Sequence, residues 1–375
     1  MPLYLDNNAT TALDSQVLDA MLPYMQGFAG NPSSVHRFGR LARNALEQAR
    51  IQVAALVGAQ PGQVIFTSGG TEANNLALQG MLGHLPAAHL AVSAIEHASL
   101  LAPAEQLQHA GWQLDTLPVN RQGQLEAETL AAKLSAESRL VSVMMANNET
   151  GVLQNIAALR QQTAEYGAWF HSDASQAAGK IAINFMDLQI DLMTLSSHKL
   201  YGPQGTGALI VNRALDIKPI IRGGGQERGL RSGTENIAAI VGFGMAAELA
   251  KQQLSSRAEH CLQLREALFK QLQQLSGIKI FSEDVESLPN TVQFAIAGFD
   301  GETLLMQLDR KGIAVSSGSA CHAEQTEPSH VLVAMGIDKA TARGAIRVSF
   351  GKDNRAEDVT TFMDALQQIM IENES

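Results

Sequence analysis

Residues 192–207 read Leu-Met-Thr-Leu-Ser-Ser-His-Lys-Leu-Tyr-Gly-Pro-Gln-Gly-Thr-Gly, with a single lysine after a short apolar run. The run 192–195 is typical of a strand buried in a parallel sheet. The glycines and proline after Lys199 indicate a turn, and a second apolar run, 208–211, predicts another buried strand. A lysine between two buried strands is costly in free energy unless it is exposed, paired or used in chemistry.

Lys199 has two interpretations on this stretch alone. It is either an ordinary lysine of a surface loop, or a lysine whose amine forms an imine with an aldehyde cofactor. The second interpretation requires the rest of the chain to supply the other parts of such a site.

Several other predicted strands also end in polar residues. The runs 64–67, 89–93, 140–145 and 168–171 are followed by Thr71, His97, Asn148 and Asp173. Alternation of these runs with helical segments favours an α/β fold with a mostly parallel sheet. Because the carboxyl ends of parallel strands share one edge, these side chains can converge with Lys199. Taken singly, a residue such as His97 is more often structural than functional.

A glycine-rich turn, Ser68 to Thr71, leads into a predicted helix at 72–80. Such a turn presents free N–H groups and the positive end of the helix dipole, which suits a phosphate. A plain capped helix start is the alternative.

Composition limits the classes of function. The chain has 375 residues, enough for two domains, and a formal net charge of −10, which argues against nonspecific binding to nucleic acid or to an anionic membrane. The N-terminus lacks the pattern of a signal peptide, no apolar stretch is long enough to span a bilayer, and no metal-ligand spacing occurs. We therefore expect a cytoplasmic protein without a metal.

The last third of the chain contains two residues that packing alone does not explain. Cys321 lies in a polar segment, 316–330, that we expect to be a long exposed loop, where the thiol is either a tolerated surface group or a mobile nucleophile. Arg347 lies inside the predicted strand 345–350 and needs a partner, which a substrate carboxylate could provide. The second cysteine, Cys261, falls in a helical pattern and is expected to be buried.

The segment around Lys199 resembles the cofactor-lysine segment of pyridoxal-phosphate enzymes of fold type I, class V. Other motifs extend this likeness in order along the chain: Tyr-Leu-Asp-Asn-Asn-Ala-Thr-Thr, Phe-Thr-Ser-Gly-Gly-Thr-Glu-Ala-Asn-Asn, Glu-His, Asn-Asn-Glu-Thr-Gly, Asp-Ala-Ser-Gln, Ser-Ser-His-Lys, Arg-Ser-Gly-Thr-Glu-Asn, Ser-Ser-Gly-Ser-Ala-Cys and Ile-Arg-Val-Ser. Together they resemble the NifS/IscS-like cysteine desulfurases, which use pyridoxal 5'-phosphate (PLP), from Leu3 to Phe350.

This resemblance implies a fold like that of aspartate aminotransferase. A large PLP-binding domain, 14–256, would carry a mixed, mostly parallel seven-stranded sheet. A small α+β domain, 1–13 and 257–375, would carry the cysteine loop. It also implies a homodimer with active sites at the interface.

The resemblance also implies a role for each matching residue. Lys199 would hold PLP and act as the base at the substrate Cα, and Cys321 would take sulfur from L-cysteine as a persulfide, leaving L-alanine. Asp173 would pair with the pyridinium nitrogen, His97 would stack on the ring and could move protons, and Gln176 would bind the ring oxygen. For phosphate binding, the resemblance implies Gly70, Thr71, Ser196, His198 and, from a second subunit, Thr234. For binding of the substrate carboxylate, it implies Asn148 and Arg347.

Some features leave alternatives open within this likeness. The seven positions from Cys321 to Pro328 (328 − 321 = 7) resemble the long-loop group I enzymes, and Asn7-Asn8 looks more NifS-like. His322 and Ala323 depart from the expected small hydroxyl residues, and the ending soon after Met370 puts delivery to an iron–sulfur scaffold in doubt. A sulfur-acceptor protein is expected, but its pathway is open between iron–sulfur assembly, tRNA thiolation and DNA phosphorothioation. Another class V enzyme, such as an aminotransferase or selenocysteine lyase, and a non-catalytic PLP-fold protein are the alternatives.

Overall fold

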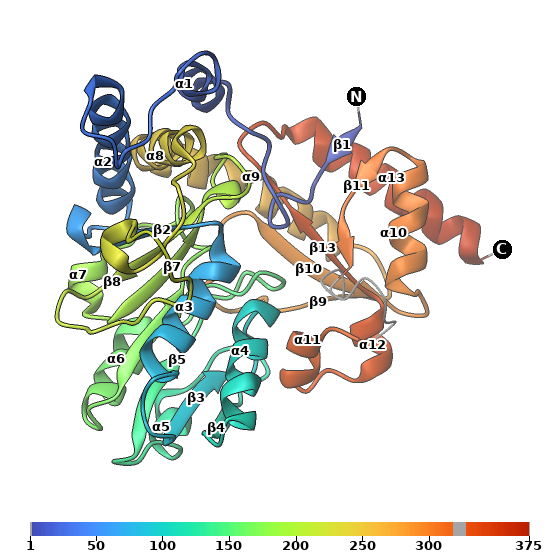
Figure 1. Ribbon diagram of the computed structural model, residues 1–375. Helices are drawn as coiled ribbons and strands as arrows, with labels where there is room; N and C mark the ends of the chain where they lie inside the picture. Colours follow the sequence, from blue (N-terminus) through green and yellow to red (C-terminus); the bar gives the residue numbers. More distant parts are fainter. Residues whose placement is uncertain (1, 318–327, 375) are drawn as a thin grey trace.

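The computed structural model describes residues 2–317 and 328–374. Its main sheet has seven strands in the order β2-β8-β7-β6-β5-β3-β4 (Figure 1). Strand β8 is antiparallel to both neighbours, and the other pairs are parallel. The predicted α/β fold with a mixed, mostly parallel seven-stranded sheet is therefore confirmed. The strands are β2 Val64–Thr67, β3 His89–Ser93, β4 Gln113–Leu117, β5 Ser138–Ser142, β6 Trp169–Asp173, β7 Leu192–Ser196 and β8 Gly207–Val211.

Both faces of this sheet are buried, because its strands carry apolar side chains on each side. In β8, Ala208 and Ile210 join one core cluster, while Leu209 and Val211 join the cluster on the opposite face. Residues of α2, α6 and α8 join the cluster on the first face, and residues of α3 and α4 join the cluster on the second. The helices of this part are α1 Ser15–Met25, α2 Arg37–Leu56, α3 Gly70–Leu82, α4 Ala98–His109, α5 Ala127–Ala131, α6 Ile156–Ala164, α7 Phe185–Leu188 and α8 Ile237–Gln252, with short 3₁₀ turns η1 Pro61–Gln63, η2 Ser197–Lys199 and η3 Glu227–Gly229.

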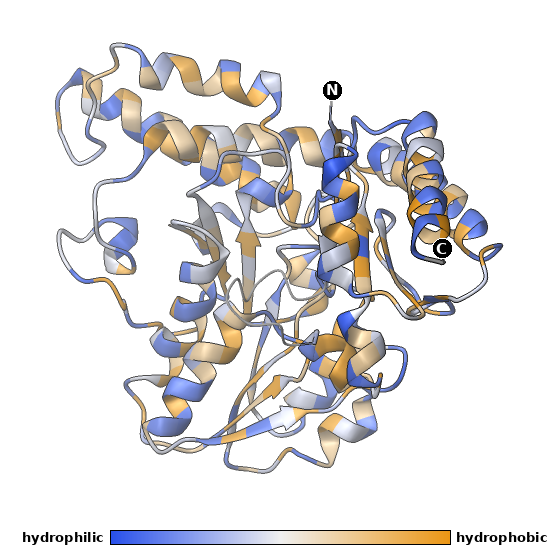
Figure 2. Ribbon diagram, turned by 90° about the vertical axis from the view of Figure 1, so that its right-hand side faces the viewer, coloured by the Kyte–Doolittle hydropathy of each residue, from blue (hydrophilic) through white to orange (hydrophobic). Residues whose placement is uncertain are grey.

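Helix α8 is apolar around most of its circumference because it lies between α1, α2 and the sheet. A Cβ atom added at Gly244 would lie 2.7 Å from Cα of Ala49, so glycine permits α8 to approach α2 closely. Most other helices carry both blue and orange segments in Figure 2, as expected where one face packs on the core and the other faces solvent.

A second, antiparallel sheet lies in the last third of the chain, in the order β12-β13-β10-β9. Its apolar residues form a separate cluster with the two long helices α9 and α13. The elements are α9 Leu254–Leu272, β9 Ile278–Ile280, β10 Thr291–Ile296, α10 Gly301–Arg310, β11 Ile313–Ala314, β12 Ser316–Ser317, α11 His330–Ala334, α12 Lys339–Arg343, β13 Ala345–Ser349 and α13 Ala356–Glu374.

The N-terminal segment packs against this last third rather than against the seven-stranded sheet. Strand β1, Leu3–Tyr4, pairs in parallel with β11, and Asp6 forms an isolated bridge with Ser349. In Figure 1 the blue start of the chain accordingly lies beside the orange and red elements. The division into residues 14–256, and 1–13 with 257–375, remains a prediction.

The structure corrects two boundaries expected from sequence. Ser316 and Ser317 are not part of an exposed loop: they are buried in β12, opposite Arg347 and Ile346 of β13, because strand pairing depends on the backbone and tolerates small polar side chains. Helix α11 then begins at His330. The helix expected at 72–80 extends from Gly70 to Leu82. Within the described residues, no helix combines the length and apolar character needed to cross a bilayer.

Candidate active site

A cavity of about 340 Å³ opens where the carboxyl edge of the seven-stranded sheet meets the second sheet and the N-terminal turn. It gathers all the residues that the sequence pointed to except Thr234 and Cys321. They are Gly70, Thr71, His97, Asn148, Asp173, Gln176, Ser196, His198, Lys199 and Arg347. The convergence of polar strand ends expected from the parallel sheet is therefore found.

Lys199 reaches this cavity from the 3₁₀ turn that follows β7. Its Nζ donates to the main-chain carbonyls of Asn8 at 2.6 Å and Ala9 at 2.7 Å. The start of β8 passes close to another loop: a Cβ atom added at Gly207 would lie 2.7 Å from the carbonyl carbon of Gly69. Glycine at 207 therefore allows β8 and the turn before α3 to approach one another.

Asp173 ends strand β6, and its carboxylate is fixed by two donors. Oδ1 accepts from the Ser175 N–H at 2.8 Å, and Oδ2 accepts from Asn74 Nδ2 at 2.8 Å. The same Asn74 nitrogen donates to Ser99 Oγ at 2.9 Å, and Ser99 Oγ lies 2.8 Å from Nδ1 of His97. Asn74 and Ser99 thus link the orientation of Asp173 to that of His97.

Two further titratable groups lie buried behind Asp173. Burial raises the pKa of Glu96 well above its usual value, and the charge of Asp173 adds to this effect, while a hydrogen bond from the Met144 N–H opposes it. Burial lowers the pKa of His171 to about 4, although Asp173 pulls in the other direction. The imidazole of His171 is therefore neutral at pH 7, and burial favours the uncharged form of Glu96.

Another part of the cavity lining carries groups that suit an anion. Helix α3 begins there at Gly70, and the first N–H groups of a helix have no acceptor within it. The hydroxyl of Ser175 lines the cavity and is buried without a hydrogen-bond partner. Burial lowers the pKa of His198 to about 4, helped by the charge of Lys199, so its imidazole is neutral at pH 7.

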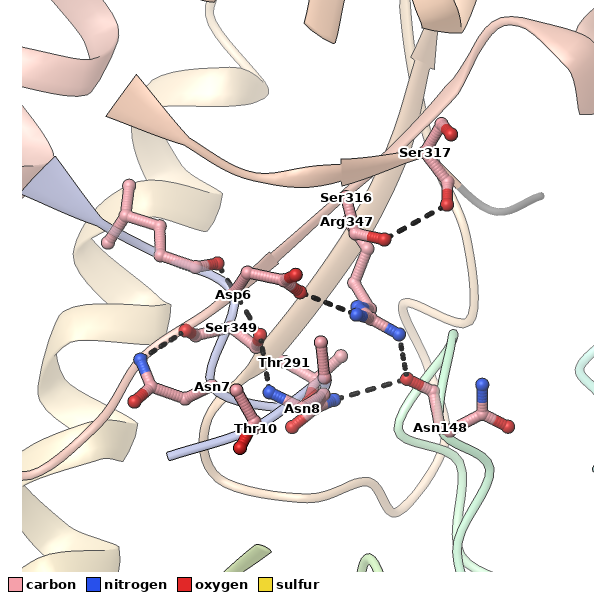
Figure 3. Close-up of polar contacts among 12 residues, drawn as sticks. Asp6, Asn7, Asn8, Thr10, Asn148, Thr291, Ser316, Ser317, Arg347 and Ser349 are labelled. Carbon is pink, nitrogen blue, oxygen red and sulfur yellow. Dashed lines mark hydrogen bonds and ion pairs between the residues drawn. The ribbon is translucent and has the colours of Figure 1, made fainter. Parts of the chain in front are cut away.

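Arg347 forms part of the wall contributed by the second sheet. It lies at the centre of β13, and its Nη1 donates to the carbonyl of Asn148 at 2.9 Å. Its Nη2 donates to Oδ1 of Asp6 at 2.6 Å (Figure 3). The buried Nε has no partner. Asp6 of this chain therefore supplies part of the pairing that an arginine within a strand requires.

The N-terminal turn, Asp6 to Thr10, is a part of the site for which sequence analysis proposed no role. The carbonyl of Asn8 accepts from Lys199 and, at 2.9 Å, from Nε2 of Gln176. Its side-chain Oδ1 accepts from Nζ of Lys180 at 2.9 Å, and Lys180 also donates to Oε1 of Gln176 at 2.9 Å. Burial lowers the pKa of Lys180 to about 7, and the charge of Lys199 acts in the same direction.

Three other residues complete the comparison with sequence. Thr234 is exposed and does not line the cavity. Cys321 lies outside the described residues. Cys261 is buried in α9, as expected, and burial raises the pKa of its thiol to about 11. Among residues 2–317 and 328–374, no group of three or more His, Cys, Asp or Glu could hold a metal ion.

The chain matches the family Aminotransferase class-V over residues 3–362. It is 40% identical, over 371 residues, to "Cysteine desulfurase IscS" of Dictyoglomus turgidum, and the match covers 98% of this chain and 94% of that protein.

Two solved structures have the same fold over almost all of this chain. One, titled "NIFS-LIKE PROTEIN", has a TM-score of 0.93 and 36% identity, with 99% of each chain covered. The other, a NifS-like protein from Rickettsia africae, has a TM-score of 0.89 and 38% identity, also with 99% of each chain covered.

Proposed function

This chain belongs to the aminotransferase class-V family as one of its cysteine desulfurases, and we propose that it uses PLP held by Lys199 and transfers the sulfur of L-cysteine to Cys321. One observation carries the assignment of the site. Lys199 and Asp173 face one cavity from adjacent strands, with Arg347 on the wall opposite them. L-alanine is the other product.

The residues present fit PLP in three respects. Lys199 supplies an amine for the aldehyde, and Asp173 supplies a buried carboxylate for the pyridine nitrogen. The start of α3, with the unpartnered Ser175 hydroxyl and neutral His198, supplies donors for the phosphate. When bound, PLP supplies an electron sink that makes the Cα–H bond of an amino acid labile.

The side chains of this protein divide the remaining tasks. Arg347 and Asn148 would bind the substrate α-carboxylate, since Arg347 keeps donors that the contacts described above do not use. Lys199 would take the proton from Cα, and His97, held by Ser99, is placed to move a further proton. The fixed orientation of Asp173 would keep its negative charge opposite the ring nitrogen.

Cys321 is proposed as the sulfur acceptor of the enzyme. The described residues on either side of its segment support this role. Ser317 lines the cavity, and the Ser329 hydroxyl donates at 2.5 Å to Glu149, which also lines the cavity. A thiolate from this segment would attack the sulfur of L-cysteine and break its Cβ–S bond, and the electron pair of that bond would stay on the carbon fragment, which takes up protons and leaves as L-alanine. The persulfide formed on the thiol would then pass its outer sulfur to an acceptor protein.

The wider setting is part of the same proposal. The protein would act in the cytoplasm as a homodimer, and Thr234, exposed in the single chain, would complete the phosphate site of the second subunit. A scaffold or sulfur-carrier protein would collect the persulfide sulfur. Iron–sulfur cluster assembly is the use that fits the name of the Dictyoglomus relative.

The experiment measures sulfide and L-alanine formed from L-cysteine by the PLP-loaded enzyme with a reductant. Cys321→Ala should keep the bound cofactor but lose sulfide release by at least about 100-fold. Cys261→Ala is the matched control, because Cys261 is the only other cysteine, and it should retain activity. Full activity of Cys321→Ala would remove Cys321 from the mechanism. Amino transfer to pyruvate without sulfide release would favour a class V aminotransferase instead.

A further inference from the structure

Asp6 forms an ion pair with Arg347, the arginine proposed to bind the substrate carboxylate. Its Oδ1 accepts from Nη2 of Arg347 at 2.6 Å, and both side chains are largely buried, with 19% and 8% exposed. Figure 3 shows the guanidinium of Arg347 between Asp6 and Asn148. A guanidinium has five N–H donors, of which these two contacts use two. Enough donors remain for a second carboxylate to bind in a bidentate manner.

The position of Asp6 is fixed by its neighbours in the turn. Asn7 donates from Nδ2 to the carbonyl of Ser349 at 2.9 Å, and the Asn8 N–H donates to Ser349 Oγ at 2.9 Å. The hydroxyl of Tyr4 donates to the carbonyl of Asp6 itself at 3.0 Å. Arg347 is fixed as well, because its strand pairs on one side with Gln293 and on the other with Ser316. The backbone that carries each side chain of the pair is therefore held in place.

Two carboxylates on one guanidinium repel each other. The α-carboxylate of a bound amino acid would meet a pair whose formal charge is zero rather than +1, in a partly buried setting where screening is weak. Substrate and product both carry this carboxylate, so the repulsion would act on L-cysteine and L-alanine alike. Interactions that bind substrate and transition state equally lower KM without raising kcat.

We propose that Asp6 is a specificity-determining residue that orients Arg347 and weakens its hold on the α-carboxylate, so that L-alanine leaves the site readily. The proposal rests on the proposed function. It assigns to Asp6 a role in binding and release and none in sulfur chemistry. On this proposal, Asp6 weakens the binding of a ligand that carries a carboxylate and does not change the binding of a simple amine.

The test compares binding of L-alanine and ethylamine, which lacks the carboxylate, to the PLP-loaded enzyme by calorimetry. Asp6→Asn keeps the size and an acceptor oxygen but removes the charge. It should bind L-alanine about fivefold more tightly, the size expected for losing one partly screened repulsion, with ethylamine binding unchanged. The KM for L-cysteine should fall by a similar factor.

Two further variants control this comparison. Asp14→Asn removes another carboxylate of the N-terminal segment that is paired with a cation, Lys352, but does not line the cavity, and it should change neither ligand's affinity. Asp6→Glu keeps the charge and should bind L-alanine within about twofold of the wild type. If Asp6→Asn fails to fold, Asp6→Glu still tests whether a carboxylate at this position sets the affinity for L-alanine.

Several results would overturn the role of Asp6. They are unchanged or weaker binding of L-alanine by Asp6→Asn, an equal gain for ethylamine, tighter binding by Asp6→Glu, or no measurable binding of L-alanine to the wild type. Failure of the proposed function would be seen separately, as normal binding of L-alanine by a wild-type enzyme that releases no sulfide from L-cysteine.

Discussion

Two parts of the cavity wall are held in place in different ways. The sheet wall, defined by His97, Asp173 and Lys199, follows the ends of strands in one sheet, and Asn74, Ser99 and Ser175 orient its first two residues from α3, α4 and the loop after β6. The turn wall, Asp6 to Thr10, is held by residues far away in sequence, such as Ser349 and Thr291. Lys199 joins the two, because its Nζ donates to carbonyls of the turn wall. The contrast indicates that the orientation of Asp173 and His97 depends on the large sheet and its helices, whereas the orientation of Arg347, which pairs with Asp6, also depends on docking of the N-terminal segment.

The largest expected effect lies in the sheet wall. Lys199→Ala should lower L-alanine release from L-cysteine roughly 10⁴-fold or more, since the residue is proposed both to hold PLP and to move the Cα proton. The visible absorbance of lysine-bound PLP should disappear. Lys251→Ala, on the exposed part of α8, is the control. Appreciable turnover by Lys199→Ala would show that another group performs these tasks.

Asp173→Asn should have the next largest effect. The amide keeps the shape of the side chain but removes the negative charge proposed to pair with the ring nitrogen, so kcat should fall about 100- to 1000-fold. The KM for L-cysteine should change little, because Arg347, the proposed carboxylate-binding residue, lies in β13 and outside the sheet wall. Steady-state kinetics separates the two quantities. A variant whose KM rises while its kcat stays unchanged would contradict the division between the walls.

A smaller effect is expected from Asn8→Ala in the turn wall. This change keeps the carbonyl that accepts from Lys199, but it removes side-chain hydrogen bonds to Thr291, Asn290 and Lys180. The free energy of unfolding should fall by about 1–3 kcal/mol, and KM should rise more than kcat falls. Urea unfolding and kinetics measure both. Unchanged stability would mean that the turn is held by its backbone alone.

The smallest effect concerns pH and two histidines close to the sheet wall, the buried His171 and the half-buried His198. The pKa values of His171 and His198 are both lowered to about 4, so the folded chain binds fewer protons than the unfolded chain between pH 6.5 and 4. The free energy of unfolding should therefore fall as pH drops through this window, by at most about 1.4 kcal/mol per pH unit for each histidine. Urea unfolding at pH 7 and 5 measures the slope, which His198→Asn should flatten. An unchanged slope would argue against a neutral His198.

The sheet wall could be predicted from sequence because its signals are local. Apolar runs that end in polar residues mark strand ends, and the topology of parallel sheets brings those ends together. This reasoning predicts that Thr71, His97, Asn148, Asp173 and Lys199 converge, and all five line the cavity.

The turn wall could not be predicted in the same way. The contribution of Asn8 to Lys199 is a backbone carbonyl, which every residue carries, and the pairing of Asp6 with Arg347 joins positions 341 apart in sequence. The supporting residues Asn74 and Lys180 were missed for the same reason, because their partners come from other elements. The polarity of Ser316 and Ser317 predicts a loop, although both residues pair with β13 as a strand.

The most direct test of the central claim is peptide mapping by mass spectrometry after brief treatment of the purified protein with L-cysteine. We expect a sulfur adduct on the peptide that contains Cys321, removable by a reductant and absent from Lys199→Ala. An unmodified Cys321 in an enzyme that nevertheless forms L-alanine from L-cysteine would contradict the account.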